Sequence, residues 1–251
     1  MTQSTRTSER LHFNRFLASL STDAKNRLMP QLELVFLPLG KILYEPGDLL
    51  RHVYFPIDST VSLLYVMENG ASGEVAVVGN DGIVGFFTVM GGDRAPSRAI
   101  VQGAGTAYRM PASRLKEEFN RHGELMTLML RYTQSVITQM AQTAVCNRHH
   151  SIDQQLCRWL LLSLDRASGT VLTMTQESIA SMLGVRREGV TEAAGKLRKA
   201  GVIEYNRGKI RILDRAKLER LSCECYLVVR KESERLVPEL YAPRQNLPRA
   251  Y

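Results

Sequence analysis

The sequence predicts an α+β chain that consists of an N-terminal β domain, a long helix and a C-terminal helix-turn-helix followed by a β-hairpin. Three observations support this prediction. Residues 35–109 contain short apolar runs between glycine and proline turns, which is typical of a sandwich or barrel-like β domain. Apolar side chains recur every three or four residues through residues 112–148, and residues 176–195 match the helix-turn-helix template.

These signals divide the 251 residues into four segments. Residues 1–111 are expected to form the β domain with short N-terminal helices, and residues 112–148 a connecting and dimerisation helix. Residues 149–221 are expected to form the helix-turn-helix domain with its hairpin, and residues 222–251 a C-terminal tail. The length and a hydrophobic content of 44% allow two modest domains, each with its own core.

The composition excludes several classes of protein. No run approaches the roughly 18 consecutive apolar residues of a membrane helix, and the N-terminal MTQSTRTSER lacks the apolar segment of a secretory signal. We therefore expect a cytoplasmic protein that does not bind a membrane. The 4 cysteines are too few and too unevenly spaced for a disulfide framework. The sequence also lacks a Walker loop, a nucleophile elbow and an HExxH motif, so we expect no enzymatic activity.

The long helical stretch is expected to break near residues 121–123 and to carry an apolar stripe beyond that break. This stripe allows two interpretations: a core helix within one chain, or a helix that pairs with its own copy in a two-fold dimer. The adjoining helix-turn-helix favours the dimer. The residues expected at the centre of the interface are Met129, Tyr132, Val136 and Met140.

The helix-turn-helix segment matches its template at several positions in register. Thr175 is expected to cap the first helix, and Gly184 falls where the tight turn needs a permissive backbone. Val190, Ala193 and Leu197 recur at the spacing of a buried helix face. An ordinary pair of helices without a role in DNA binding is the alternative.

A basic stripe follows the turn. Residues 186–220 carry 11 basic and 5 acidic side chains, which is typical of a nucleic-acid surface, although a solvated basic face is the alternative. Cations are disfavoured at a helix N-terminus, but they become favourable when DNA phosphates and guanine edges lie in front of it. The residues expected to contact DNA are Thr175, Gln176, Arg186, Arg187, Glu188, Thr191, Glu192, Arg198, Lys209 and Arg211.

The segment VIEYNRGKIRILD predicts a β-hairpin with its turn at NRGK. Lys209 and Arg211 alternate with Ile210 and Ile212, so one face of the hairpin is apolar and the other basic. The basic face is expected to contact the phosphate backbone of DNA, as a wing does. A hairpin that is merely solvated is the alternative.

The order of these segments, over almost all of the chain, resembles the Crp/Fnr family of bacterial transcription regulators. The stretch LGVRREGVTEAAGKLRKAGVIEYNRGKIRI is similar to the family's recognition element and is the most specific part of the match. The resemblance implies a β-roll of the cyclic-nucleotide-binding type and a winged helix-turn-helix. It also implies that Arg187 and Glu188 read bases in the major groove. Where the family often has a second base-reading arginine, this chain has Glu192, which implies a different operator.

The same resemblance indicates where an effector would bind. Family members that bind cyclic nucleotides use a Gly-Glu pair and, about ten residues later, an Arg-Ser or Arg-Thr pair whose arginine neutralises the cyclic phosphate. Here Gly85 is followed by Phe86, and Ser97 and Arg98 stand in reversed order. We therefore expect that neither cyclic AMP nor cyclic GMP binds, and that any effector is another small molecule.

The cysteines and histidines allow one further kind of site. Cys146, His149 and His150, together with Cys223 and Cys225, could form a Cys/His metal site if the two segments met in space. Their spacing matches no standard zinc motif, so we expect no metal and no cofactor. No cysteine precedes Cys146, which argues against the N-terminal iron–sulfur cluster of some family members. A labile disulfide between Cys223 and Cys225 is the redox alternative.

The sequence therefore predicts a homodimeric, sequence-specific transcription regulator that binds double-stranded DNA at a palindromic operator and is not controlled by cyclic AMP. RNA polymerase is an expected partner. The alternative is a ligand-sensing or scaffolding module whose helix-turn-helix contacts protein instead of DNA. Its supporting feature is Glu192, followed by the small residues Ala193, Ala194 and Gly195.

Overall fold

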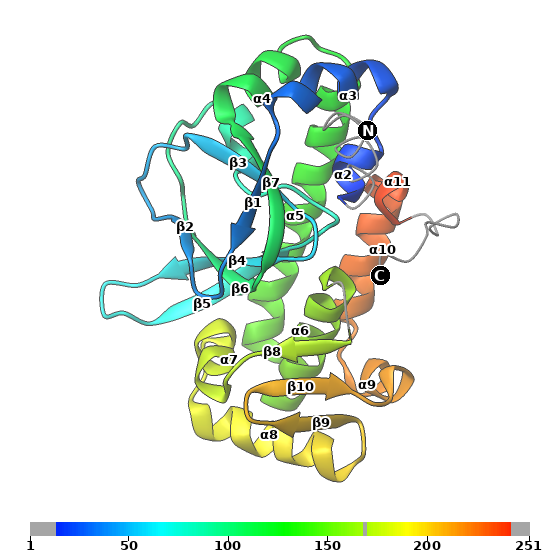
Figure 1. Cartoon of the computed structure of the whole chain (residues 1–251). Coiled ribbons are helices and arrows are strands. Elements are labelled where there is room, and N and C mark those ends of the chain that lie inside the picture. Colours follow the sequence, from blue (N-terminus) through cyan, green and yellow to red (C-terminus); the bar gives the residue numbers. More distant parts are fainter. Residues whose placement is uncertain (1–13, 168–169, 242–251) are drawn as a thin grey trace.

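The computed structural model describes residues 14–167 and 170–241. Figure 1 shows the β domain beside the upper part of the long helix α5 (Glu124–His149), and the C-terminal module at the lower end of this helix. Helix α10 (Cys225–Leu236) packs along α5 and leads the chain back towards the N-terminal helices. The predicted order of β domain, long helix and C-terminal module is confirmed.

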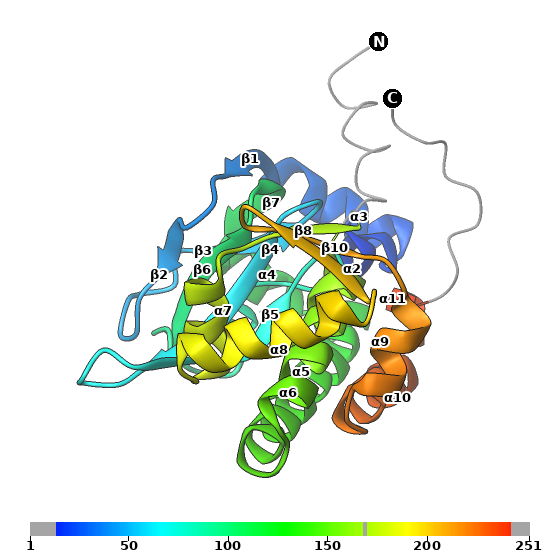
Figure 2. The same cartoon turned by 90° about the horizontal axis from the view of Figure 1, so that it is seen from below.

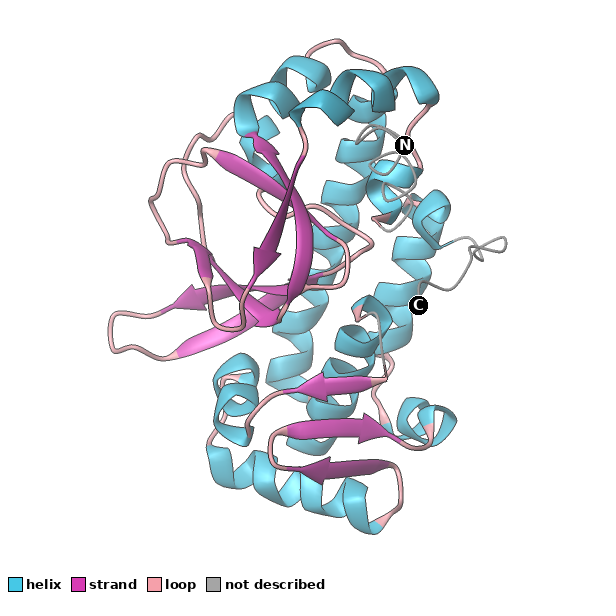
Figure 3. Ribbon diagram, viewed as in Figure 1, coloured by secondary structure: helices cyan, strands magenta, loops and turns pink. Residues whose placement is uncertain are grey.

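The β domain begins with short helices, and its two sheets are antiparallel throughout (Figure 3). Asn14 and Ser21 cap the first two described helices with their side chains. One sheet has the order β1-β7-β3 and the other β2-β6-β4-β5. The elements are α2 (Arg15–Ala18), α3 (Thr22–Leu28), η2 (Met29–Gln31), β1 (Glu33–Leu37), β2 (Ile42–Tyr44), β3 (His52–Pro56), β4 (Thr60–Val66), β5 (Ser72–Val78), η3 (Phe86–Val89), β6 (Arg98–Gly103), β7 (Gly105–Pro111) and α4 (Ala112–Phe119).

Aromatic side chains join the β domain to α5. The rings of Phe16 and Phe86 meet Tyr132 of α5 edge to face, with centroids 5.6 and 5.8 Å away. The Tyr132 hydroxyl also accepts a hydrogen bond of 3.2 Å from the backbone N–H of Ile83. A side chain at Gly82 would collide with Tyr132, so this close approach requires glycine. The helix is therefore part of the core of the β domain.

The four residues expected at the dimer interface belong to this core. Met129, Tyr132 and Val136 are 0%, 5% and 4% exposed, and Met140 packs against the same cluster while half-buried. The prediction is therefore wrong for Met129, Tyr132 and Val136, whose side chains are already buried within one chain. The most apolar stripe of α5 packs on the β domain and shares its apolar core.

A second row of α5 residues lies exposed on another side of the helix. Leu130, Gln134, Ile137, Ala141 and Ala144 follow one another in alternating steps of four and three residues. Leu130 and Ile137 are 54% and 52% exposed. Alternating steps of this kind are the spacing of a coiled-coil seam.

The C-terminal module contains the predicted helix-turn-helix and hairpin, packed around a second apolar core. Its sheet has the order β8-β10-β9, and Figure 2 shows α8 on the surface of the module. The short strand β8 is not predicted from the sequence. The elements are α6 (Ile152–Arg166), β8 (Val171–Thr173), α7 (Gln176–Leu183), α8 (Arg187–Lys199), β9 (Ile203–Asn206), β10 (Lys209–Ile212) and α9 (Arg215–Leu221).

The segment expected to be a C-terminal tail is helical up to Tyr241. After α10, the short helix α11 (Pro238–Tyr241) follows, and residues 242–251 lie outside the described part of the chain. Tyr226 and Val229 of α10 are buried. Within the described ranges, no helix combines the length and apolar character that crossing a membrane requires.

Charged side chains join the β domain to α6. Arg166 forms a buried ion pair with Asp81, with 3.3 Å between Nε and Oδ2. Glu74 of β5 is also buried and accepts a hydrogen bond of 2.5 Å from the Ser62 hydroxyl. Burial raises the pKa of Glu74 to about 7, although Ser62 and the positive charge of Arg158 act in the opposite direction.

Candidate nucleic-acid interface

Local sequence signals define the two helices of the helix-turn-helix. The Thr175 hydroxyl accepts a hydrogen bond of 3.1 Å from the N–H of Ser178, so the predicted N-cap is confirmed. Gly184 ends α7 with a φ of 66°, the left-handed conformation that the tight turn needs. Val190 and Leu197 are buried in the core that α8 shares with α7 and α6. These contacts hold α8 rigidly at the surface.

Helix α8 begins with two arginines, although the partial positive charge of a helix N-terminus disfavours cations. Arg186 is the N-cap residue, and its side chain makes no capping hydrogen bond. Arg187 is the first helical residue, and its Nε lies 4.0 Å from Oε2 of Glu177. Both side chains of this pair are mostly exposed, so the pair contributes little to stability. The start of α8 is therefore suited to an anionic ligand.

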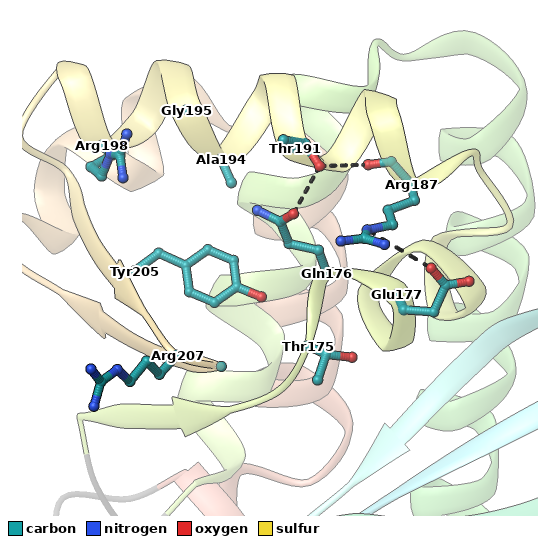
Figure 4. A pocket seen from close by; sticks show the side chains of 11 residues that line it. Thr175, Gln176, Glu177, Arg187, Thr191, Ala194, Gly195, Arg198, Tyr205 and Arg207 are labelled. Carbon is teal, nitrogen blue, oxygen red and sulfur yellow. Dashed lines mark hydrogen bonds and ion pairs between the residues drawn. The ribbon is translucent and has the colours of Figure 1, made fainter.

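Side chains of α8 and of the hairpin line one open groove (Figure 4). Arg187, Thr191 and Arg198 lie along α8, while Tyr205 and Arg207 come from the hairpin on the other side of the groove. Arg198 and Arg207 form no ion pair with any residue in the described part of the chain. The groove thus gathers three guanidinium groups, two of which have no carboxylate partner among residues 14–167 and 170–241.

Hydrogen bonds hold the walls of this groove in place. The Thr191 hydroxyl donates to Oε1 of Gln176 at 2.8 Å, which ties α8 to the start of α7. The Tyr205 hydroxyl donates to the carbonyl of Met174 at 2.9 Å. Burial raises the pKa of Tyr205, and the charge of Arg187 lowers it in part. Tyr205 is therefore a neutral donor whose proton is already engaged.

The two predicted glutamates lie outside the groove, on the adjoining exposed side of α8. Glu192 pairs with Lys196 at 2.9 Å, and Lys196 also pairs with Asp153 of α6 at 3.0 Å. Hydrogen bonds from Lys196 to these two carboxylates raise the pKa of its ammonium group. Glu188 has no ion pair with a described residue. The charge of Glu192 is thus compensated within the module.

The hairpin places its basic residues in two settings. Arg207 and Gly208 form its turn with φ values of 48° and 76°, as a two-residue hairpin turn requires. Arg207 lines the groove, whereas the predicted residues Lys209 and Arg211 are exposed on β10 outside it. Arg211 lies 3.9 Å from Glu204 on the neighbouring strand. Sequence reasoning missed Arg207, although the NRGK turn signal places an arginine at the tip.

Among the residues predicted for an effector pocket, Phe86 and Ser97 are buried and Arg98 is paired with a carboxylate. Gly85 adopts a φ of 88°, and Phe86 after it is 2% exposed. Ser97 is buried, and its hydroxyl has no hydrogen-bond partner among the described residues. Nε of Arg98 lies 2.8 Å from Oε2 of Glu45. Phe86 therefore fills the interior with a ring that accepts no hydroxyl hydrogen bond, and the charge of Arg98 is compensated.

The two cysteine-bearing segments, which are distant in the sequence, meet at the lower end of α5. The metal-binding atoms of Cys146, His150, Cys223 and Cys225 all lie within 4.8 Å of one another. His149 is exposed and does not belong to this cluster. The condition that the two segments meet in space is fulfilled, so spacing along the sequence no longer argues against a metal site.

Two family models match the chain in the order in which the domains occur. A cyclic nucleotide-binding domain model matches residues 34–122, and a Crp-like helix-turn-helix domain model matches residues 154–221. The chain belongs to the Crp/Fnr family. As a Crp/Fnr protein it is a DNA-binding transcription regulator, which confirms the predicted function class, and it is not an enzyme.

Relatives of known role cover most of this Crp/Fnr chain. It is 26% identical to the global nitrogen regulator of Synechocystis sp., over 79% of this chain and 92% of that protein. It is 25% identical to the global nitrogen regulator of Nostoc sp., over 69% of this chain and 82% of that protein.

Solved structures show the same fold at low sequence identity. FixK2 from Bradyrhizobium japonicum has a TM-score of 0.66 at 15% identity, covering 76% of this chain and 98% of that chain. The c-di-GMP-responsive global regulator CLP of Xanthomonas campestris has a TM-score of 0.63 at 14% identity, covering 77% and 100%.

Proposed function

We propose that the groove between α8 and the hairpin binds double-stranded DNA, and that a homodimer presents two such grooves to a palindromic operator. The observation that carries this proposal is the convergence of Arg187, Arg198 and Arg207 on one groove from two separate elements. Arg198 and Arg207 have no ion pair with a described residue, and phosphate oxygens are the partners that suit them.

The residues of this surface are expected to have different roles. Arg187 has a planar fork suited to O6 and N7 of guanine, and Glu188 beside it suits the amino group of cytosine. Arg207 and Lys209 lie on the hairpin, from which phosphates are within reach but base edges are not. These two residues should add affinity without adding sequence preference.

The exposed row from Leu130 to Ala144 is the proposed dimer interface. Its alternating spacing suits pairing with the same row of a second chain, and Ile137 lies at its centre. A two-fold axis along α5 would present two copies of α8 to successive major grooves. The half-sites of the operator are then inverted repeats with centres about 34 Å apart.

We further propose that cyclic AMP does not control this regulator. A buried phenyl ring at Phe86 would leave the ribose hydroxyls of the nucleotide without partners, which costs about 1 to 3 kcal/mol for each unpaired group. RNA polymerase is the expected partner at the promoter, and the cytoplasm the expected location.

Selection of bound duplexes from a random DNA library, with the full chain as bait, tests the proposal. We expect an enriched inverted repeat. On that operator, Arg198→Ala should weaken binding about tenfold and flatten the dependence of log K on log salt by about one unit per subunit. Arg220→Ala is the matched control, because Arg220 is exposed on α9 outside the groove. Equal losses in both variants would contradict the groove assignment. Absence of any enriched sequence would favour the protein-contact alternative.

A further inference from the structure

Four side chains with metal-binding atoms meet between the end of α5 and the start of α10. Cys146 lies in the last turn of α5, and His150 is the C-cap residue whose N–H donates to the Cys146 carbonyl at 3.0 Å. Cys223 precedes α10, and Cys225 is its first residue. The packing of α10 along α5 brings the two pairs together, although the whole of residues 151–222 separates them.

We propose that these four residues bind one zinc ion in tetrahedral geometry. Sγ of Cys146 lies 3.5 Å from Sγ of Cys223, and Sγ of Cys225 lies 3.4 Å from Nδ1 of His150. Tetrahedral zinc with Zn–S bonds of about 2.3 Å and Zn–N bonds of about 2.0 Å separates two sulfurs by about 3.8 Å, and sulfur from nitrogen by about 3.5 Å. These two separations differ from the ideal values by a few tenths of an ångström, and all four donor atoms lie within 4.8 Å of one another.

The donor set identifies the kind of ion. Three thiolates and one imidazole are a ligand set of structural zinc sites, and four protein ligands leave no position open for catalysis. Magnesium and calcium prefer oxygen ligands, which the cluster does not offer. In an iron–sulfur cluster of several irons the cysteines bind different metal atoms, which would spread the sulfurs more widely than the 4.8 Å found here.

The surroundings of the cluster support a bound ion. Nδ1 of His150 faces the sulfurs, while its Nε2 lies 3.3 Å from Oε1 of Glu224, so the ring is held between ligand position and carboxylate. A carboxylate on the second nitrogen is the usual partner of a metal-bound histidine. The amide of Gln142 donates to Sγ of Cys225 at 3.1 Å, and such a donor stabilises a thiolate.

Burial gives the cluster a closed interior. Cys146, Cys223 and Cys225 are 0%, 4% and 0% exposed, and they form a buried cluster of their own, apart from the two apolar cores. The Sγ separation of 3.5 Å between Cys146 and Cys223 is far longer than the roughly 2.05 Å of a disulfide. An ion at the centre would join the three sulfurs to one another and to His150.

The location of the site suggests what the zinc would do. Residues 151–222, which contain the whole helix-turn-helix and hairpin, form the loop that the ion closes. His150 is the C-cap residue of α5, and Ser151 caps α6 directly after it, so one ligand lies at the junction between the long helix and the DNA-binding module. Zinc would hold both ends of that module against α5 and limit its orientations. Because the ion closes a long loop, it would also reduce the conformational entropy of the unfolded chain and so stabilise the fold.

Metal analysis of the purified full-length chain tests the proposal directly. Under reducing conditions we expect about one zinc ion per chain. After removal of zinc by a chelator, titration with Co²⁺ should produce the intense visible bands of tetrahedral thiolate coordination, and zinc should displace the cobalt and raise the Tm. Purified chain that carries no zinc, binds no Co²⁺ and contains a Cys146–Cys223 disulfide would overturn the proposal.

Variants with matched controls locate the site. Cys223→Ser and His150→Gln should weaken zinc binding by more than about 100-fold, and Glu224→Gln by about 10- to 100-fold. Cys157→Ser, a buried cysteine of α6 outside the cluster, and His149→Gln, the exposed neighbour, should retain zinc. Retention of zinc in His150→Gln, or its loss in His149→Gln, would contradict the assignment. If Cys223→Ser does not fold, His150→Gln and the cobalt spectrum of the unaltered chain still decide.

Discussion

Replacement of Ile137 by glutamate is expected to dissociate the dimer without unfolding the chain. Ile137 is 52% exposed in the single chain, so dimerisation can bury about half of its side chain, which contributes roughly 1 kcal/mol per chain. A carboxylate in the same place costs several kcal/mol per ion, and two like charges would face each other across the two-fold axis. A total of at least about 4 kcal/mol corresponds to roughly thousandfold weaker association.

Light scattering at several protein concentrations measures the mass, and circular dichroism reports whether the chain is folded. The adjacent substitution Val136→Glu is the control, because Val136 is 4% exposed in the core of the β domain. A buried, unpaired charge there should unfold the chain and not merely separate two folded subunits. The assignment of the two faces of α5 is refuted if Ile137→Glu keeps the dimeric mass while Val136→Glu yields folded monomers.

Four further outcomes are expected. Arg187→Ala should weaken operator binding by about 1 to 3 kcal/mol per half-site in fluorescence anisotropy while slightly raising the Tm of the free protein. Arg207→Ala should weaken binding to all duplexes about equally and reduce the salt slope by about one unit per subunit, so an unchanged slope would argue against a phosphate contact. Burial raises the pKa of Glu74 from 4.5 to about 7, so the folded chain holds a proton that the unfolded chain releases. The free energy of unfolding in urea should therefore fall by up to about 3 kcal/mol between pH 5 and pH 8, relative to that of Glu74→Gln. Parallel pH profiles of the two proteins would exclude this effect. Cyclic AMP should change neither the Tm nor the DNA affinity, and saturable micromolar binding in calorimetry would show that Phe86 does not block it.

The order of elements could be predicted because local signals in this chain are strong. The roles of Thr175 and Gly184 could be predicted from residue type alone, because a hydroxyl caps a helix and glycine allows a positive φ. The break at residues 121–123 separates α4 from α5 as expected, with His122 at a φ of 57°. A capping box at Ser151 begins α6 in the same way.

The faces of α5 could not be predicted, because the helix carries two candidate rows that differ by one residue. Val136 and Ile137 are both apolar and β-branched, and only the rotation of the helix against the sheets decides which one is buried. Periodicity finds a stripe but does not say what covers it. The more apolar stripe packs within the chain, so the proposed interface is the more polar row that contains Gln134 and Ala141.

The sequence named the residues of the cysteine cluster but could not show that the two segments meet. That proximity depends on α10 folding back along α5. Treating residues 222–251 as a tail removes this contact. Arg207 was missed because the alternation of basic and apolar residues along β10 indicated Lys209 and Arg211. The arginine that lines the groove lies instead in the turn before β10.

The arginine at the start of α8 shows how binding and local stability oppose each other in this module. A cation in the first turn of a helix costs about 0.3 to 1 kcal/mol, and Glu177 at 4.0 Å offsets little of it because both side chains are exposed. A DNA phosphate at the same place would reverse the balance, since it accepts hydrogen bonds from the helix N–H groups and from the guanidinium group. Arg198 provides the comparison, because it lies in the last turn of α8, where the helix dipole favours a cation. Replacement of Arg187 by alanine should therefore raise thermal stability and lower operator affinity, whereas replacement of Arg198 should lower both.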